Sequence, residues 1–337
     1  MIFRPLKTAV VTALAMLAMT SKAEESTVNY TPEIHGILRA RWELATESGN
    51  SRFQVRNARV SVGGNMASFA SYYVLVDACA SGKFQFLDAY ASLRASRQLT
   101  FRVGQFKIPF GTDNLRAMGD YYFSNRPFLA KQATGRRSVG IMATYAVPRT
   151  TLKLSGGVFN STAIADHTKW NNKYAGAVRA VLGLGDFSIA ANYKSVCPDS
   201  VRVNLVGGSV TWTSGRWTAE GEYVYKHYSN DAFKNASGYD FFVDYEMPLK
   251  KTAFNALSFQ GRFDGLTDHS DGTRDDSGHL TVNQPGRKRV TLGSTLMWRH
   301  SKLSTRLRLN YEKYFYDDRA ANPGNSDILT AEVIVTF

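Results

Sequence analysis

Residues 303–312 read LSTRLRLNYE, and the alternation in this stretch decides the fold class. Successive side chains of a β-strand point to opposite faces. One face of this segment is therefore apolar, and the other carries Ser304, Arg306, Arg308, Asn310 and Glu312. Segments of about ten residues with the same pattern repeat to the C-terminus, whereas a helical period is almost absent after residue 20.

Counting these segments gives sixteen candidate strands, whose connections alternate in length. Short turns are predicted at residues 65–68, 95–98, 148–150, 183–186, 214–216, 248–251 and 300–302. The longer connections are residues 109–137, 161–172, 230–237, 266–286 and 317–326. Tight periplasmic turns and long outer loops are typical of a transmembrane barrel and not of a soluble sandwich. The sequence therefore predicts an all-β fold, a transmembrane antiparallel β-barrel of about 16 strands around a water-filled lumen. A phase slip near Asn57 predicts a bulge in the second strand.

Residues 1–23 have the features of a signal peptide. Arg4 and Lys7 precede an apolar run that is too short to span a bilayer, and small residues surround Ala23. Cleavage would lower the formal net charge from +13 to +10, since three basic residues are removed. We expect an exported protein whose residues 24–337 form a barrel in the outer membrane of a Gram-negative bacterium. The terminal aromatic Phe337 resembles the assembly signal of such barrels.

The charges of the strands are expected to face inward, because charge on the lipid face is costly. The inward set holds sixteen Lys and Arg against eleven Asp and Glu, and the acids concentrate in the strands near residues 222 and 242. A transverse field between a basic and an acidic wall is therefore expected. The cations predicted to line the pore are Arg39, Arg41, Arg59, Arg94, Arg102 and Arg262. Nucleic-acid binding is a poor alternative, because these residues form no continuous exposed stripe.

The connection at residues 109–137 is the candidate constriction loop. A connection of this length is usually functional or disordered, and it carries five cations against Asp113 and Asp120. If it folds inward, guanidinium and ammonium groups would bind anions at the narrowest point. If it folds outward, they would meet lipopolysaccharide phosphates. The candidate anion-binding residues are Lys107, Arg116, Arg126, Lys131, Arg136 and Arg137.

The stretch GQFKIPFG, residues 104–111, leads into this loop and resembles the signature that precedes the constriction loop of the phosphate-selective porin O and P family. Residues 56–60, 136–140, 157–160 and 262–264 are similar to other parts of that family. The resemblance implies a homotrimer of sixteen-stranded barrels with anion-preferring pores lined by Arg and Lys. Asn57 stands where a basic residue is common in the family, so anion preference carries over better than phosphate selectivity.

Other classes of function find less support. The six histidines are scattered, and the acidic residues 268–276 lack the spacing of a calcium loop, so we expect no metal, no cofactor and no catalytic residues. Cys79 and Cys197 lie six predicted strands apart, which disfavours a disulfide. The alternatives are a general porin, a plugged structural or surface-binding barrel, and a barrel-type hydrolase. The expected partners are inorganic anions including phosphate, small hydrophilic solutes, outer-membrane lipid and lipopolysaccharide, but not nucleic acid.

Overall fold

The computed structural model describes residues 28–161, 168, 170, 172–250, 252–317 and 327–337. The predicted signal peptide lies outside these residues, as do parts of the predicted connections 161–172, 248–251 and 317–326. The strands are β1 (Glu33–Ala45), β2 (Ser51–Ala67), β3 (Ala70–Asp77), β4 (Gln85–Arg94), β5 (Leu99–Lys107), β6 (Arg137–Ala146), β7 (Lys153–Asn160), β8 (Tyr174–Leu184), β9 (Phe187–Val196), β10 (Val203–Ser214), β11 (Trp217–Tyr228), β12 (Ala236–Pro248), β13 (Ala256–Leu266), β14 (His269–Arg274), β15 (Leu280–Gln284), β16 (Arg287–His300), β17 (Leu303–Tyr316) and β18 (Ile328–Thr336). The short helices are α2 (Thr112–Leu115), η1 (Met118–Asp120), η2 (Leu129–Thr134) and η4 (Ser229–Asp231).

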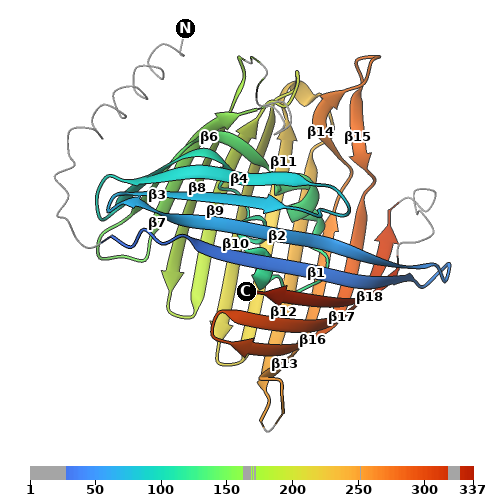
Figure 1. Ribbon diagram of the computed structural model, residues 1–337. Coiled ribbons are helices and arrows are strands. Elements are labelled where there is room, and N and C mark those ends of the chain that lie inside the picture. The colour runs from blue at the N-terminus through green and yellow to red at the C-terminus, as the bar shows by residue number, and fades with distance from the viewer. Residues whose placement is uncertain (1–27, 162–167, 169, 171, 251, 318–326) are drawn as a thin grey trace.

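Sixteen of these strands form one closed antiparallel barrel, which confirms the predicted fold class and strand number. Each strand pairs with its neighbours in the barrel, and β18 pairs with β1 to close the circle (Figure 1). Strands β14 and β15 form a separate hairpin within the connection between β13 and β16. No helix in the described ranges is long and apolar enough to cross a membrane.

The alternation of residues 303–312 becomes the two faces of β17. Leu307 and Leu309 are 39% and 49% exposed on the outside of the barrel, whereas Arg308, Asn310 and Glu312 are buried inside. The same division holds on β18, where Val333 is exposed and Glu332 is buried. An apolar outer face and a polar inner face are what a barrel in lipid requires, because lipid cannot solvate charge.

The connections also alternate as predicted. At one end of the barrel, here called the turn end, connections of two to seven residues join the strands, as between β2 and β3 or β12 and β13. At the other end, here called the loop end, lie most of the longer connections, including residues 108–136 and 267–286. Both β1 and the C-terminal strand have their free ends at the turn end, as expected when an even number of strands closes a barrel.

Two local features of the first strands have clear causes. The register between β1 and β2 shifts between Arg39 and Ala40, which leaves Arg56 as the extra residue and confirms the predicted bulge near Asn57. The backbone of Phe337 exchanges hydrogen bonds of 2.8 and 3.1 Å with Gly36. The Phe337 ring lies where a Cβ at position 36 would stand, 2.1 Å from its nearest atom, so a larger residue at this position would have to displace the ring.

Candidate functional site

Residues 108–136 form a loop that enters the barrel, and GQFKIPFG anchors its first part. Phe106, Ile108 and Phe110 are buried in an apolar core inside the barrel, together with Leu129 and Ala130 from the later part of the loop. The wall contributes residues from β6 to β11 to this core, namely Met142, Phe159, Ala175, Ala177, Val196, Val203, Leu205, Val224 and Tyr228. The apolar residues of the motif therefore fasten the loop inside the barrel.

Two polar details of the motif complete this anchor. The Lys107 ammonium donates hydrogen bonds to the carbonyl oxygens of Asn114 at 2.6 Å and Arg116 at 3.0 Å, which ties the end of β5 to helix α2. Gly104 has a φ of +131°, and a Cβ there would lie 2.2 Å from the carbonyl oxygen of Ala89. Glycine is required at this position because the β4 backbone passes too close for any side chain.

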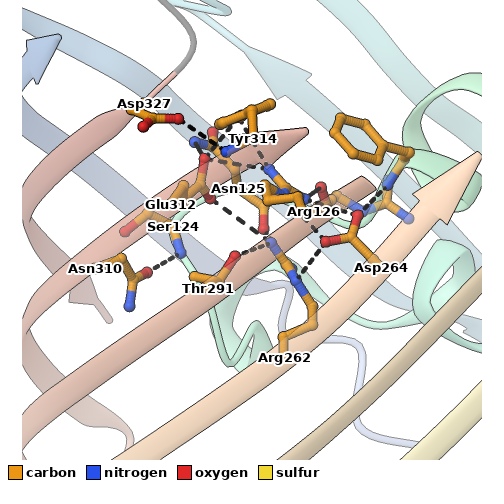
Figure 2. Close-up of polar contacts among 12 residues, drawn as sticks. Ser124, Asn125, Arg126, Arg262, Asp264, Thr291, Asn310, Glu312, Tyr314 and Asp327 are labelled. Atoms are coloured by element: carbon orange, nitrogen blue, oxygen red, sulfur yellow. Dashed lines mark hydrogen bonds and ion pairs between the residues drawn. The ribbon is translucent and has the colours of Figure 1, made fainter. Parts of the chain in front are cut away.

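The second half of the loop is attached by hydrogen bonds to a cluster of buried ion pairs in the wall (Figure 2). Asp264 is fully buried and accepts two hydrogen bonds of 3.0 Å from the Arg289 guanidinium. The same carboxylate lies 3.2 Å from Arg262 and accepts the backbone N–H of Phe128 at 2.9 Å. Glu312 accepts a hydrogen bond from Asn125 at 3.0 Å and one from Arg289 at 3.2 Å. Each buried charge therefore has an opposite charge within reach, as burial demands.

Arginines of the wall also bind the backbone of the loop. Arg39 donates to the carbonyl oxygen of Ser124 at 2.7 Å, and Arg262 donates to that of Asn125 at 2.8 Å. Arg306 and Arg308 donate to the carbonyl oxygens of Gly119 and Tyr121. Irregular backbone at membrane depth must have its polar groups satisfied inside the protein, and these side chains satisfy them.

Wall carboxylates on β11, β13 and β17 contact the loop directly. Glu220 binds Arg116 at 2.6 Å, and Glu222 accepts the backbone N–H groups of Thr112 at 2.9 Å and Asp113 at 3.0 Å. Asp264 and Glu312 bind the loop as described above, and all four carboxylates are buried. The loop thus covers this acidic part of the wall. Glu220 is paired with Arg116 of the loop, whereas Asp264 and Glu312 are paired with Arg262 and Arg289 of the wall.

The opposite wall remains uncovered and borders a cavity of about 580 Å³. Residues from β1 to β8 line one side of this cavity, and Pro109, Leu115, Ala117 and Met118 of the loop line the other. Six lining residues are Lys or Arg, namely Arg59, Arg102, Lys107, Arg137, Lys153 and Arg179. Asp88 is the single carboxylate among the lining residues that the structure describes, and it is bound to Arg137 at 2.9 Å.

The structure separates the predicted site residues into groups. Arg59, Arg102, Lys107 and Arg137 line the cavity. The predicted residues that are instead paired within or beneath the loop are Arg39, Arg41, Arg116, Arg126 and Arg262. Arg136 donates to the carbonyl oxygen of Ser161, while Lys131 and Arg94 are exposed, the latter at the turn end. The loop cations therefore do not converge on one point, because Arg116 is held by Glu220 and Asp113.

The selection of site residues from the sequence missed part of the cavity lining. Lys153 and Arg179 belong to the sixteen Lys and Arg that the sequence predicts to face inward, but nothing in their spacing distinguished them from the other members of that set. Tyr73 and Tyr90 were not expected to matter, although they line the same cavity. The available signal was their position in the alternation: Tyr73 lies two residues from Ser71, and Tyr90 lies two residues from Asp88 and Ser92, so each shares a strand face with polar residues.

The hairpin β14–β15 packs at the loop end of the barrel. Ser270 accepts hydrogen bonds from the Tyr228 hydroxyl at 2.6 Å and from Lys226, and Leu280 packs against the apolar core. Burial, and then the nearby charge of Lys226, lowers the pKa of His269 to about 4. Among the described residues no group of three or more His, Cys, Asp or Glu side chains is arranged to hold a metal ion. Cys79 and Cys197 are free thiols.

Comparison of the fold with solved structures identifies outer-membrane porins. A porin described as anion-selective, from Comamonas acidovorans, superposes with a TM-score of 0.61 at 10% identity, covering 91% of this chain and 99% of that one. Salmonella typhi OmpF, in complex with daunomycin, superposes with a TM-score of 0.63 at 11% identity, covering 91% of this chain and 98% of that one. The trimer form of Vibrio cholerae OmpT superposes with a TM-score of 0.60 at 10% identity, covering 91% of this chain and 98% of that one. These identities are low, so the likeness concerns the fold.

The sequence itself was compared with known families and with curated proteins. No curated protein matches it significantly. A family model matches residues 39–184, which extend from β1 to the end of β8. The matched part therefore contains the uncovered wall and the entire loop. The resemblance predicted from GQFKIPFG is therefore confirmed: residues 39–184 match the phosphate-selective porin O and P family, and they lie in a sixteen-stranded porin fold.

Proposed function

We propose that this protein is a passive, anion-preferring porin of the outer membrane of a Gram-negative bacterium. The observation that carries the proposal is the position of the loop. It covers the carboxylates of β11, β13 and β17 and leaves six Lys and Arg of the opposite wall around the cavity. A solute that passes between the loop and the wall would meet an excess of positive charge.

The charge of this path follows from its ion pairs. Arg59 is paired with Asp77 at 2.9 Å and Arg137 with Asp88 at 2.9 Å. Within the described ranges, Arg102, Lys107, Lys153 and Arg179 have no carboxylate within 4.0 Å. Two unit charges 4 Å apart attract by about 1 kcal/mol even in bulk water, so four unpaired cations at a constriction favour an anion over a cation severalfold.

Phosphate selectivity is the finer form of the proposal. Arginine forks bind phosphate oxygens in pairs, and the arginines of the cavity present such groups. Inorganic phosphate would then be one of the transported anions, together with chloride and small hydrophilic solutes. The family match supports this choice of solute. A general porin without anion preference, a plugged barrel and a barrel hydrolase are the alternatives.

Reversal potentials in planar bilayers with a KCl gradient test the proposal. Chloride should carry most of the current in the unmodified protein. The double variant Lys153→Gln with Arg179→Gln should shift the reversal potential toward that of potassium, since it removes two unpaired cations. Lys302→Gln is the matched control, because this exposed lysine lies in the turn between β16 and β17. Potassium preference in the unmodified protein would overturn the proposal, and an absence of current would favour the plugged barrel.

The assembly and export of the protein belong to the same proposal. We infer a homotrimer, supported by the similarity of the fold to the trimer form of OmpT, and cleavage of residues 1–23 before insertion in the outer membrane. N-terminal sequencing of the protein from outer-membrane fractions tests the cleavage. Native mass spectrometry in detergent tests the trimer, and a monomer mass would contradict it.

A further inference from the structure

The cavity between the loop and the uncovered wall contains apolar side chains as well as cations. Tyr73, Leu75, Met142 and Val181 come from the wall, and Leu115 and Met118 are the opposing loop residues. Apolar side chains do not favour the passage of inorganic ions, because dehydrating an ion next to apolar groups is unfavourable. The mixture points instead to a solute that has both an apolar group and a negative charge.

The aromatic residues of this cavity form a connected row. Tyr73 and Tyr90 are cross-strand partners with ring centroids 5.3 Å apart, and Tyr90 and Phe106 meet edge to face at 5.8 Å. The Arg102 guanidinium lies 4.2 Å from the centroid of the Tyr90 ring. Both tyrosines are only partly buried, so their rings remain accessible from the cavity. Arg102 thus presents a positive charge directly beside an aromatic surface.

Cations flank this aromatic row on several strands. Lys107 and Arg137 are register partners on β5 and β6. Arg179 donates to Asn192 and, at 3.0 Å, to the hydroxyl of Thr112, so its charge is not cancelled by a carboxylate. Lys153 lies on the adjacent strand β7. The charged end of a bound solute would therefore find cations on the strands next to the tyrosines, from β5 to β8.

The same lining makes a neutral sugar a poor occupant. Sugar hydroxyls need hydrogen-bond acceptors, and Asp88, the single carboxylate among the described lining residues, is bound in a fork by Arg137. The hydroxyls of Thr144 and Ser155 lie 3.1 Å apart and bind each other. A cavity of about 580 Å³ is also much larger than an inorganic anion requires and is in the range that holds a small organic molecule.

We propose that this cavity is a binding site for organic anions in which a carboxylate or phosphate is attached to a flat apolar group. The anionic group binds among Arg102, Lys107, Lys153 and Arg179, and the apolar group packs against Tyr73 and Tyr90. The inference rests on the proposed anion-preferring channel and names a solute class for the same path. Burial of about 55 Å² of apolar surface would strengthen binding about tenfold relative to the parent inorganic ion.

Block of the chloride current in planar bilayers tests the inference. The probes are two charge-matched pairs: phenyl phosphate against inorganic phosphate, and benzoate against acetate. In the unmodified protein each aromatic anion should reach half-block at a concentration about tenfold lower than its partner. Equal half-blocking concentrations within both pairs would overturn the inference. They would leave the proposed function intact if the KCl reversal potential still showed chloride preference.

Variants separate the apolar contribution from the charge. Tyr73→Ser with Tyr90→Ser should bring the ratio of half-blocking concentrations close to one without moving the reversal potential. Arg102→Gln should weaken block by both members of each pair. Tyr223→Ser is the control, since this tyrosine is 51% exposed on the outer face of β11. If the double variant does not fold, Leu75→Asn serves in its place, because Leu75 lines the same cavity. A ratio that stays unchanged in the tyrosine double variant, or in Leu75→Asn, would contradict the site.

Discussion

The attachment of the loop to the acidic wall should depend on Asp264, and Asp264→Asn tests this directly. The carboxylate is fully buried and binds Arg289 through two hydrogen bonds of 3.0 Å. It also accepts the backbone N–H of Phe128 at 2.9 Å, which is the direct contact with the loop. An amide of the same shape keeps one acceptor oxygen but loses the negative charge. Glu312 is then the remaining carboxylate that contacts both Arg262 and Arg289.

The size of the effect follows from the burial of these groups. Removing one partner of a buried ion pair typically costs about 3–5 kcal/mol, because the other charge stays buried and loses compensation, here from Asp264 while Glu312 remains. The barrel itself is held by strand pairing around its whole circumference. We therefore expect the cost to appear as detachment of the loop, whose released fraction should rise on the order of a hundredfold or more, since 1.4 kcal/mol corresponds to a factor of ten.

Single-channel recording is the appropriate assay. The Asp264→Asn channel should have a larger conductance and more current fluctuation, and its chloride preference should fall because the wall carboxylates become accessible to solutes. Asp244→Asn is the matched control, since Asp244 is also a wall carboxylate but accepts its hydrogen bond from Ser258 of the neighbouring strand. A conductance and a reversal potential equal to those of the unmodified protein would refute the assigned role of this carboxylate.

Three further predictions concern folding and pH. Gly104→Ala should lower the free energy of unfolding by at least about 2 kcal/mol, because its Cβ would meet the Ala89 carbonyl at 2.2 Å, whereas Gly176→Ala should be neutral, with no atom of another part of the chain within 4 Å of its Cβ. Urea unfolding followed by gel mobility measures both, and equal stabilities would contradict the close contact. Gly36→Val should displace the Phe337 ring and lower the thermal unfolding midpoint, which circular dichroism would record; an unchanged midpoint would show that the ring is free to move. His269 should make docking of the β14–β15 hairpin pH-dependent. Its pKa is lowered from 6.5 to about 4, so the docked state favours the neutral imidazole. The stability of the docked hairpin is therefore complete above pH 6.5 and falls as the pH falls toward 4. Protonation would place a charge beside Lys226 and Arg287, and only the backbone hydrogen bond with Thr267 and the charge of Asp271 favour the protonated form. Amide hydrogen exchange in residues 269–274 should therefore rise at pH 5 relative to a His269→Phe variant, and equal exchange would refute the coupling.

The features of the fold that depend on periodicity could be predicted from the sequence. Alternation in segments such as 303–312 identified the strands, and the unequal connections identified the two ends of the barrel, because a strand in lipid must have an apolar and a polar face. GQFKIPFG marked the entry to the loop. The bulge near Asn57 was visible as a break in the alternation. Each of these features is local, so each can be recognised without knowing which strands lie opposite one another.

The site could not be predicted in the same way. Arg116 and Lys107 are both cations at the start of the loop, yet Arg116 binds Glu220 on the acidic wall whereas Lys107 lines the cavity. Arg116 is held by Glu220, which is more than a hundred positions away in the sequence. Lys107 is held by the carbonyl oxygens of Asn114 and Arg116, which are a few positions away. The row formed by Tyr73, Tyr90 and Phe106 likewise depends on the register of neighbouring strands.

The sequence by itself thus determined the barrel, its strand number, its polar lumen and the existence of a basic loop, because alternation and connection length follow directly from the need to satisfy every backbone group in lipid. Only the tertiary structure decided which wall the loop covers. That choice depends on the pairing of Asp264, Glu312, Glu220 and Glu222 with loop groups and on the apolar anchor around Phe106 and Phe110. Burial of an unpaired carboxylate is costly, so the loop lies where the acids are, and the cations of the opposite wall are left to face the solute.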